Sequence, residues 1–179
     1  MSSQDSFGEL LCLRCGMCCN GVLFKDVELQ PGDDARHLAA LGLPVRVTRS
    51  AKPKEKCAQP CAVLEADNCC RIYADRPVRC RQFECVQLKS VRAGEIDLNT
   101  AQRTIERARQ RVDSVRTLLR RLGDGNEGLP LSVRFNRLKR RLERDCRDER
   151  AAEDFARLTF AMHELNLLLS TAFYPAPGD

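Results

Sequence analysis

Residues 12–19 read Cys12-Leu-Arg-Cys15-Gly-Met-Cys18-Cys19, and this short run organises the first half of the chain. A gap of two residues between cysteines lets a tight turn bring two thiolates onto one metal ion. Gly16 supplies the backbone freedom that such a turn often needs. The same spacing opens the ferredoxin-type run that wraps an iron–sulfur cluster. Cys18 and Cys19 are adjacent, so they fit separate metals better than one small tetrahedral ion.

A second cysteine-rich block follows later in the first half. It holds six more cysteines: Cys57, Cys61, Cys69, Cys70, Cys80 and Cys85. The N-terminal residues have no basic region followed by an apolar run, so we expect no signal peptide and a cytoplasmic protein. In that reducing compartment, clustered cysteines usually bind metal or do redox work. The odd total of 11 cysteines also argues against a complete set of disulfides.

Composition excludes several classes of protein. The 179 residues include no long apolar run of the kind that a membrane span needs, so we expect no membrane association. The formal charge of +5 counts every thiol as neutral, but metal ligands are thiolates. Eight thiolates with two zinc ions would change the sum by −8 + 4 = −4 and leave about +1. The charge therefore gives little support to a nucleic-acid partner, and we expect none.

The second half of the chain predicts helices. Three apolar stripes at helical spacing run from Leu98 to Leu122, from Leu131 through Leu138 to Cys146, and from Phe155 to Ala172. They predict helices over residues 98–122, 131–146 and 150–172, with Cys146 as a core thiol. Because single amphipathic helices are marginal in water, we expect the three to pack as an antiparallel bundle.

The first half predicts little regular structure. Residues 22–24 and 27–29 read as short strands, Pro31 suits the first turn of a helix that Gly42 and Pro44 would stop, and residues 50–56 read as an exposed loop. The expected fold is mainly α with little β: a loop-rich, cysteine-ligated metal module and a C-terminal antiparallel helical bundle. We expect a metal-binding domain over residues 1–93 and a helical extension over residues 94–179 packed on it.

Several residues besides the cysteines carry a family resemblance. After the run at residues 12–19 come Cys61-Ala-Val-Leu, then Cys70-Arg-Ile-Tyr-Ala-Asp-Arg-Pro-Val-Arg-Cys80, and then Phe83-Glu-Cys85. This order resembles the YkgJ-like cysteine-cluster family, also known as the CxxCxxCC zinc- or iron-chelating domain. The resemblance covers residues 12–85 and leaves the helical half outside. Members are described as zinc-binding proteins or iron–sulfur oxidoreductases, and some flagellin lysine N-methylases contain a similar motif.

The resemblance implies a set of eight metal ligands: Cys12, Cys15, Cys18, Cys19, Cys61, Cys70, Cys80 and Cys85. Cys57 and Cys69 are extra to the family pattern, and Cys69 is an alternative to Cys70. Eight thiolates make two complete four-thiolate sites, or one iron–sulfur cubane and one zinc. Thiolate softness favours zinc, iron–sulfur or copper(I) over magnesium or calcium. The residues alone do not choose between zinc and an iron–sulfur cluster.

Tyr73 and Arg76 are candidate cofactor-binding residues beside these cysteines. Arg76-Pro77 would fix a turn after Tyr73, so that the phenol ring packs over the site, and Arg76 would stabilise thiolates by charge and N–H donation. Solvated surface arginines are the competing interpretation. Sequence identifies no catalytic residue, because it contains no phosphate-binding loop, no G-x-G-x-x-G motif and no readable Ser/His/Asp arrangement.

Two functional hypotheses stay open. The first is a cytoplasmic metal–thiolate protein that binds zinc or an iron–sulfur cluster and carries out redox or metal-handling work, as an oxidoreductase or an accessory protein. The excess of cysteines over the four that one structural zinc needs favours it. The second is a structural-zinc interaction module without catalysis, whose C-terminal helices bind a protein partner or a nucleic acid. The self-contained helical half favours this second hypothesis.

Overall fold

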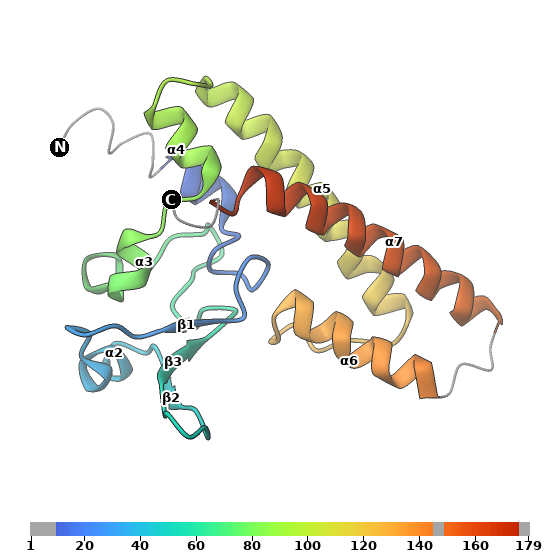
Figure 1. Cartoon of the computed structure of the whole chain (residues 1–179), viewed down its shortest axis with the longest axis horizontal. Coiled ribbons are helices and arrows are strands. Elements are labelled where there is room, and N and C mark those ends of the chain that lie inside the picture. Colours follow the sequence, from blue (N-terminus) through green and yellow to red (C-terminus); the bar gives the residue numbers. More distant parts are fainter. Residues whose placement is uncertain (1–9, 145–148, 176–179) are drawn as a thin grey trace. The chain divides into compact units, whose positions relative to one another are not determined.

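The computed structural model describes residues 10–144 and 149–175 (Figure 1). Its chain divides into two compact units. The sheet unit comprises residues 16–83 and 128–130, and the helical unit comprises the described residues of 1–15, 84–127 and 131–179. The fold is mostly helical with one small sheet, as the sequence predicts.

Three short strands form the sheet. They are β1 (Asp26–Glu28), β2 (Val45–Val47) and β3 (Glu55–Ala58), and β3 lies in the middle of the order β1-β3-β2. Both pairings are antiparallel, and they place Cys57 opposite Val27 on one side and Val45 on the other. Ion pairs join the strands: Lys54 Nζ lies 2.9 Å from Glu28 Oε1, and Lys56 Nζ lies 2.9 Å from Asp26 Oδ1. The middle strand thus fixes Cys57 at the centre of the sheet.

The apolar core of the sheet unit is small. One cluster of its buried side chains comprises Leu38, Leu43, Cys57, Val63 and Ile72, and Met17, Val22 and Leu23 are buried as well. Leu38 comes from α2 (Ala35–Ala40), which begins where the Asp34 carboxylate accepts hydrogen bonds from the backbone N–H groups of Arg36 and His37. A core of this size supplies little hydrophobic stabilisation, so a unit built on it needs a further cross-link.

Local predictions in this unit were partly wrong. Residues 22–24 form no strand, because the Leu23 N–H bonds to the Met17 carbonyl and so joins the preceding turn. The helix begins at Ala35 and not near Pro31. The predicted loop over residues 50–56 is shorter, because β3 already begins at Glu55. The sequence did not predict this strand, because its residues Glu55 and Lys56 are charged and form no alternating apolar pattern.

The helical unit is built on two long helices that pack side by side, α5 (Leu98–Arg121) and α7 (Glu149–Ala172) (Figure 1). They run antiparallel, because Arg111 pairs with Glu164 whereas Arg121, ten residues later, pairs with Asp154, ten residues earlier. The predicted apolar stripes of the two helices are buried where α5 and α7 pack together. The fully buried members are Ala101, Ile105, Ala108, Val112, Val115 and Leu119 of α5, with Leu158, Met162, Leu165 and Leu169 of α7.

Two further helices flank α5 in the sequence of this unit, and residues 10–15 are helical as well. α4 (Val86–Arg92) precedes α5, and α6 (Leu131–Arg144) follows it. The Arg134 guanidinium, only 2% exposed, lies 2.7 Å from Asp124 Oδ2 and ties α6 to the loop after α5. The three predicted helices are confirmed with small shifts at their ends. Cys146 lies outside the described residues.

The packing of α5 on α7 gives a stability prediction. Leu165 is fully buried at 0% exposure, whereas Leu167, on the outer side of the same helix, is 50% exposed. Replacing Leu165 with alanine should lower the free energy of unfolding of the helical unit by about 2–5 kcal/mol, because it leaves a cavity. The matched Leu167→Ala variant should change it by less than about 0.5 kcal/mol. Urea unfolding followed by circular dichroism measures both; equal losses would contradict the packing.

Within the described residues, the helices lack any stretch that combines enough length with enough apolar character to cross a bilayer.

Candidate metal centre

The cysteines of the sheet unit lie on backbone segments that hydrogen bonds hold together. The Cys61 N–H donates to the Cys19 carbonyl at 2.7 Å, which joins the CxxCxxCC run to the second block. Residues 61–71 then fold into a tight loop, in which the Arg71 N–H bonds to the Val63 carbonyl and Cys70 pairs with Leu64 in an isolated β-bridge. Cys70 is thereby returned to the neighbourhood of Cys61.

Gly16 positions the first cysteine turn against this loop. Its φ of +65° lies in the left-handed region, which favours glycine. A Cβ at this position would lie 2.3 Å from Oδ1 of Asn68, the residue before Cys69-Cys70. The turn is closed by two hydrogen bonds to the Gly16 carbonyl, from the N–H groups of Cys19 and Asn20. The close approach of the turn to Asn68 therefore requires glycine.

Cys80 comes from a third segment. It lies in α3 (Val78–Gln82), which follows the 3-10 turn Tyr73–Asp75. The start of α3 is anchored to the sheet side of the unit, because the Val78 N–H donates to Asp33 Oδ1 at 2.8 Å. Burial raises the pKa of the Cys80 thiol to about 12, with smaller contributions from the charges of Cys61, Cys70 and Cys57. Cys80 is therefore close enough to these three thiols to interact with them electrostatically.

The other three thiols belong to the same neighbourhood. Cys57 is 1% exposed, and Cys61 and Cys70 pack against the core that contains it. Burial raises the pKa of Cys57 to about 11, with a smaller contribution from Cys61. Burial likewise raises the pKa of Cys61, opposed by backbone N–H groups and increased by Cys70. The four half-buried or buried thiols Cys57, Cys61, Cys70 and Cys80, all without disulfides, form what we call the sheet-unit thiol cluster.

The raised pKa values of Cys57, Cys61 and Cys80 indicate how a bound metal would change their protonation. Protonated thiols are favoured while the cluster is buried and unbridged, since thiolate charges repel one another in a poorly solvated place. A divalent metal reverses this balance, because it binds the thiolates and removes the repulsion. Among the described residues, no three Cys, His, Asp or Glu side chains already surround a single point at ligand spacing. A metal ion held by these thiols would require their sulfur atoms to move closer together.

Cys57 is the member of this cluster that sequence reasoning left undecided. It is extra to the family pattern, and its signal was only the three-residue gap before Cys61. Cys69, the other undecided cysteine, differs from it, because the pKa of Cys69 is raised mainly by a hydrogen bond with the side chain of Asp67. Cys70, by contrast, packs against the core of the sheet unit and raises the pKa of Cys80.

The remaining predicted ligands divide between the units. Cys18 and Cys19 belong to the sheet unit, whereas Cys12, Cys15 and Cys85 belong to the helical unit. Cys85 is the N-cap residue of α4, where burial raises the pKa of its thiol and the N–H groups of Leu88 and Gln87 oppose that rise. The ligand role of all five stays a prediction.

Tyr73 and Arg76 form a stacked pair at the edge of the cluster. The Arg76 guanidinium carbon lies 3.6 Å from the centroid of the Tyr73 ring, and its Nε donates to the Tyr73 carbonyl at 2.9 Å. The charge of Arg76 lowers the pKa of Cys80, against the larger effect of burial. Tyr73 itself is 47% exposed. Arg76 is therefore placed to favour the Cys80 thiolate, and Tyr73 holds Arg76 in that position.

Comparison with known proteins adds a family. The model of the family CxxCxxCC, described as "Putative zinc- or iron-chelating domain", matches residues 11–108, more than half of the chain. The match continues past Cys85 into α5, so the helical half is not wholly outside the family as the motifs alone suggested. No curated protein and no solved structure gives a significant match. The cysteine pattern and the length of the family match together show that this chain belongs to the CxxCxxCC family of zinc- or iron-chelating domains.

Proposed function

We propose that this chain is a metal–thiolate protein whose sheet unit folds around a zinc or iron centre held by Cys57, Cys61, Cys70 and Cys80. The observation that carries the proposal is that Cys57 lies in the core of the sheet unit, that Cys61 and Cys70 pack against that core, and that Cys80 is close enough for the charges of all three to raise its pKa. Four thiolates are the donor set of both structural zinc and iron–sulfur clusters. The thiols present therefore fit either centre.

The chain's own residues would supply the rest of the chemistry. When bound, the metal would supply positive charge that keeps the four thiols deprotonated. The apolar residues Leu43, Val63 and Ile72 exclude water from one side of the cluster. Arg76 offsets thiolate charge near Cys80. The other five ligands that the resemblance implies are Cys12, Cys15, Cys18, Cys19 and Cys85, so the inclusion of Cys57 raises the number of candidate ligands from eight to nine.

A structural-zinc interaction module without catalysis is the second candidate. One observation favours it: Phe160 and Leu167 of α7 are 67% and 50% exposed, and they lie seven residues apart on the same side of the helix. A pair of exposed large apolar residues on one helix is a common feature of protein-binding surfaces. In this reading the metal serves only to fold the sheet unit.

Metal analysis of anaerobically purified protein tests the proposal and separates its two forms. We expect at least one metal ion or cluster per chain. A brown protein with visible absorption and matching iron and sulfide contents supports a cluster and a redox role. A colourless protein with zinc supports the structural centre. Protein that is fully folded, with all its cysteines reduced, and that contains less than 0.1 equivalent of any transition metal (an order-of-magnitude threshold) would contradict both.

A further inference from the structure

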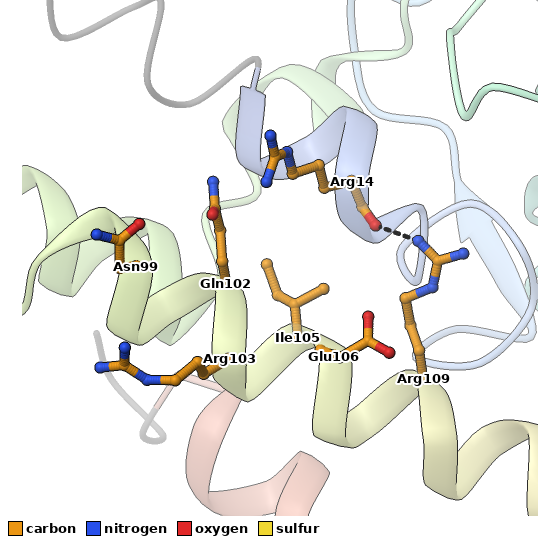
Figure 2. A pocket seen from close by; sticks show the side chains of 7 residues that line it. All are labelled: Arg14, Asn99, Gln102, Arg103, Ile105, Glu106 and Arg109. Atoms are coloured by element: carbon orange, nitrogen blue, oxygen red, sulfur yellow. Dashed lines mark hydrogen bonds between the residues drawn. The ribbon is translucent and has the colours of Figure 1, made fainter.

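An open surface pocket of about 420 Å³, called the cavity below, lies in the helical unit between residues 10–15 and the N-terminal half of α5 (Figure 2), and its charged side chains are exposed. Its walls combine three guanidinium groups, two amides and one carboxylate, from Arg14, Arg103, Arg109, Asn99, Gln102 and Glu106. The buried side chain of Ile105 forms an apolar part of the floor. The volume is within the range of small-molecule sites.

The positive charge of this cavity is not neutralised as it is elsewhere on α5. Outside the cavity, four of the five other arginines of this helix pair with carboxylates, and Arg107 is the exception among the described residues: Arg111 pairs with Glu164, Arg116 with Asp113, Arg120 with Glu127 and Arg121 with Asp154. Inside it, Arg103 donates to the Thr100 hydroxyl at 2.9 Å, and Arg109 donates to the Arg14 carbonyl at 2.6 Å. Both acceptors are neutral, and among the described residues no carboxylate lies within ion-pair distance of either guanidinium.

The arrangement of the side chains suits an oxyanion. Figure 2 shows Arg14 and Gln102 on the upper side of the cavity, Asn99 and Arg103 at one end, and Glu106 and Arg109 at the other. Guanidinium groups bind carboxylates and phosphates with paired N–H donors, and the two amides add further donors. The single carboxylate, Glu106, leaves the lining with an excess of two positive charges. A concave site with this excess raises the local concentration of anions.

We propose that this cavity binds a small organic acid or phosphate ester through its oxyanion group, with Arg103 as the main ligand-binding residue. Arg14 lies within the Cys12-Leu-Arg-Cys15 run, so the bound anion would lie beside two predicted metal ligands. The site does not depend on the proposed metal centre, because all its residues belong to the helical unit. Failure of the metal proposal would therefore leave this one intact.

Calorimetric titration of the full-length protein with inorganic phosphate and, separately, with succinate tests the proposal at low ionic strength. We expect saturable binding of one anion per chain. Arg103→Gln should weaken it roughly tenfold or more, because a charge-assisted pair of hydrogen bonds is lost. Glu106→Gln should tighten it a few-fold, because it removes the carboxylate that opposes the anion.

The matched control is Arg116→Gln, which changes the net charge by the same amount on the same helix but outside the cavity. It should leave the affinity unchanged within about twofold. Binding of phosphate alone or succinate alone identifies which oxyanion the site prefers, and both results support the proposal. Absence of saturable binding for both probes would overturn it. Equal weakening by Arg103→Gln and Arg116→Gln would also overturn it, because it would show nonspecific attraction.

Discussion

Replacing Cys80 with serine should remove the metal from the sheet unit and unfold it. Cys80 is close enough to the other three members of the sheet-unit thiol cluster for their charges to raise the pKa of its thiol. A serine hydroxyl is a hard, weakly acidic donor that replaces a soft thiolate poorly. We expect at least about a 100-fold loss of metal affinity, since losing even an outer partner of a metal ligand costs 10–100-fold.

Elemental analysis after dialysis, together with limited proteolysis of residues 16–83, measures both effects. Cys69→Ser is the matched control: the same chemical change, next to Cys70, at a side chain that interacts mainly with Asp67. It should keep its metal and its protease resistance. A Cys80→Ser protein with full metal content would show that this thiol is not a ligand and would contradict the proposed four-thiolate centre.

Cys57→Ser decides the fourth ligand by the same measurement. We expect it to lose metal as Cys80→Ser does, because Cys57 is buried at the centre of the sheet beside Cys61. Since serine is close to cysteine in size, simple loss of packing should be small for this variant. Metal retention in Cys57→Ser would show that Cys57 is not the fourth ligand and would leave Cys18 and Cys19 as the candidates for it.

The helical half could be predicted from sequence because one physical rule controls it. Apolar residues three and four positions apart must share a face, so the stripe from Leu98 to Leu122 specified both the helix and its buried side. The glycine-rich break after Leu122 marked its end. The same rule does not predict what the arginines of α5 contact. Only the packing of residues 10–15 beside α5 shows that Arg103 and Arg109 line a cavity.

The cysteine half could be predicted less well. The family resemblance implied Cys61, Cys70 and Cys80 as ligands, because each stands in a motif with a fixed family order, and this role stays a prediction. It did not place Cys57, whose role depends on a strand that short ion pairs stabilise and that no apolar alternation reveals. It also could not decide between Cys69 and Cys70. That choice depends on which way the tight loop after Val63 turns its two adjacent thiols.

Removal of metal should unfold the sheet unit and leave the helical unit folded. The helical unit has an extensive apolar interface between α5 and α7, which needs no metal. The sheet unit has a small core that contains the thiols themselves. Where a metal site forms only in the folded state, its binding free energy is folding free energy, on the order of 10 kcal/mol for structural zinc. Loss of the metal should therefore unfold the sheet unit alone.

Hydrogen–deuterium exchange of the full-length protein, before and after complete chelation under reducing conditions, tests this claim most directly because it observes each unit separately. Backbone amides of β3 and of residues 61–71 should lose their protection on chelation and regain it when metal is returned. Amides of α5 and α7 should stay protected throughout, which serves as the internal control. Unchanged protection of residues 16–83 in protein shown to be metal-free would contradict the claim that this unit folds around a metal.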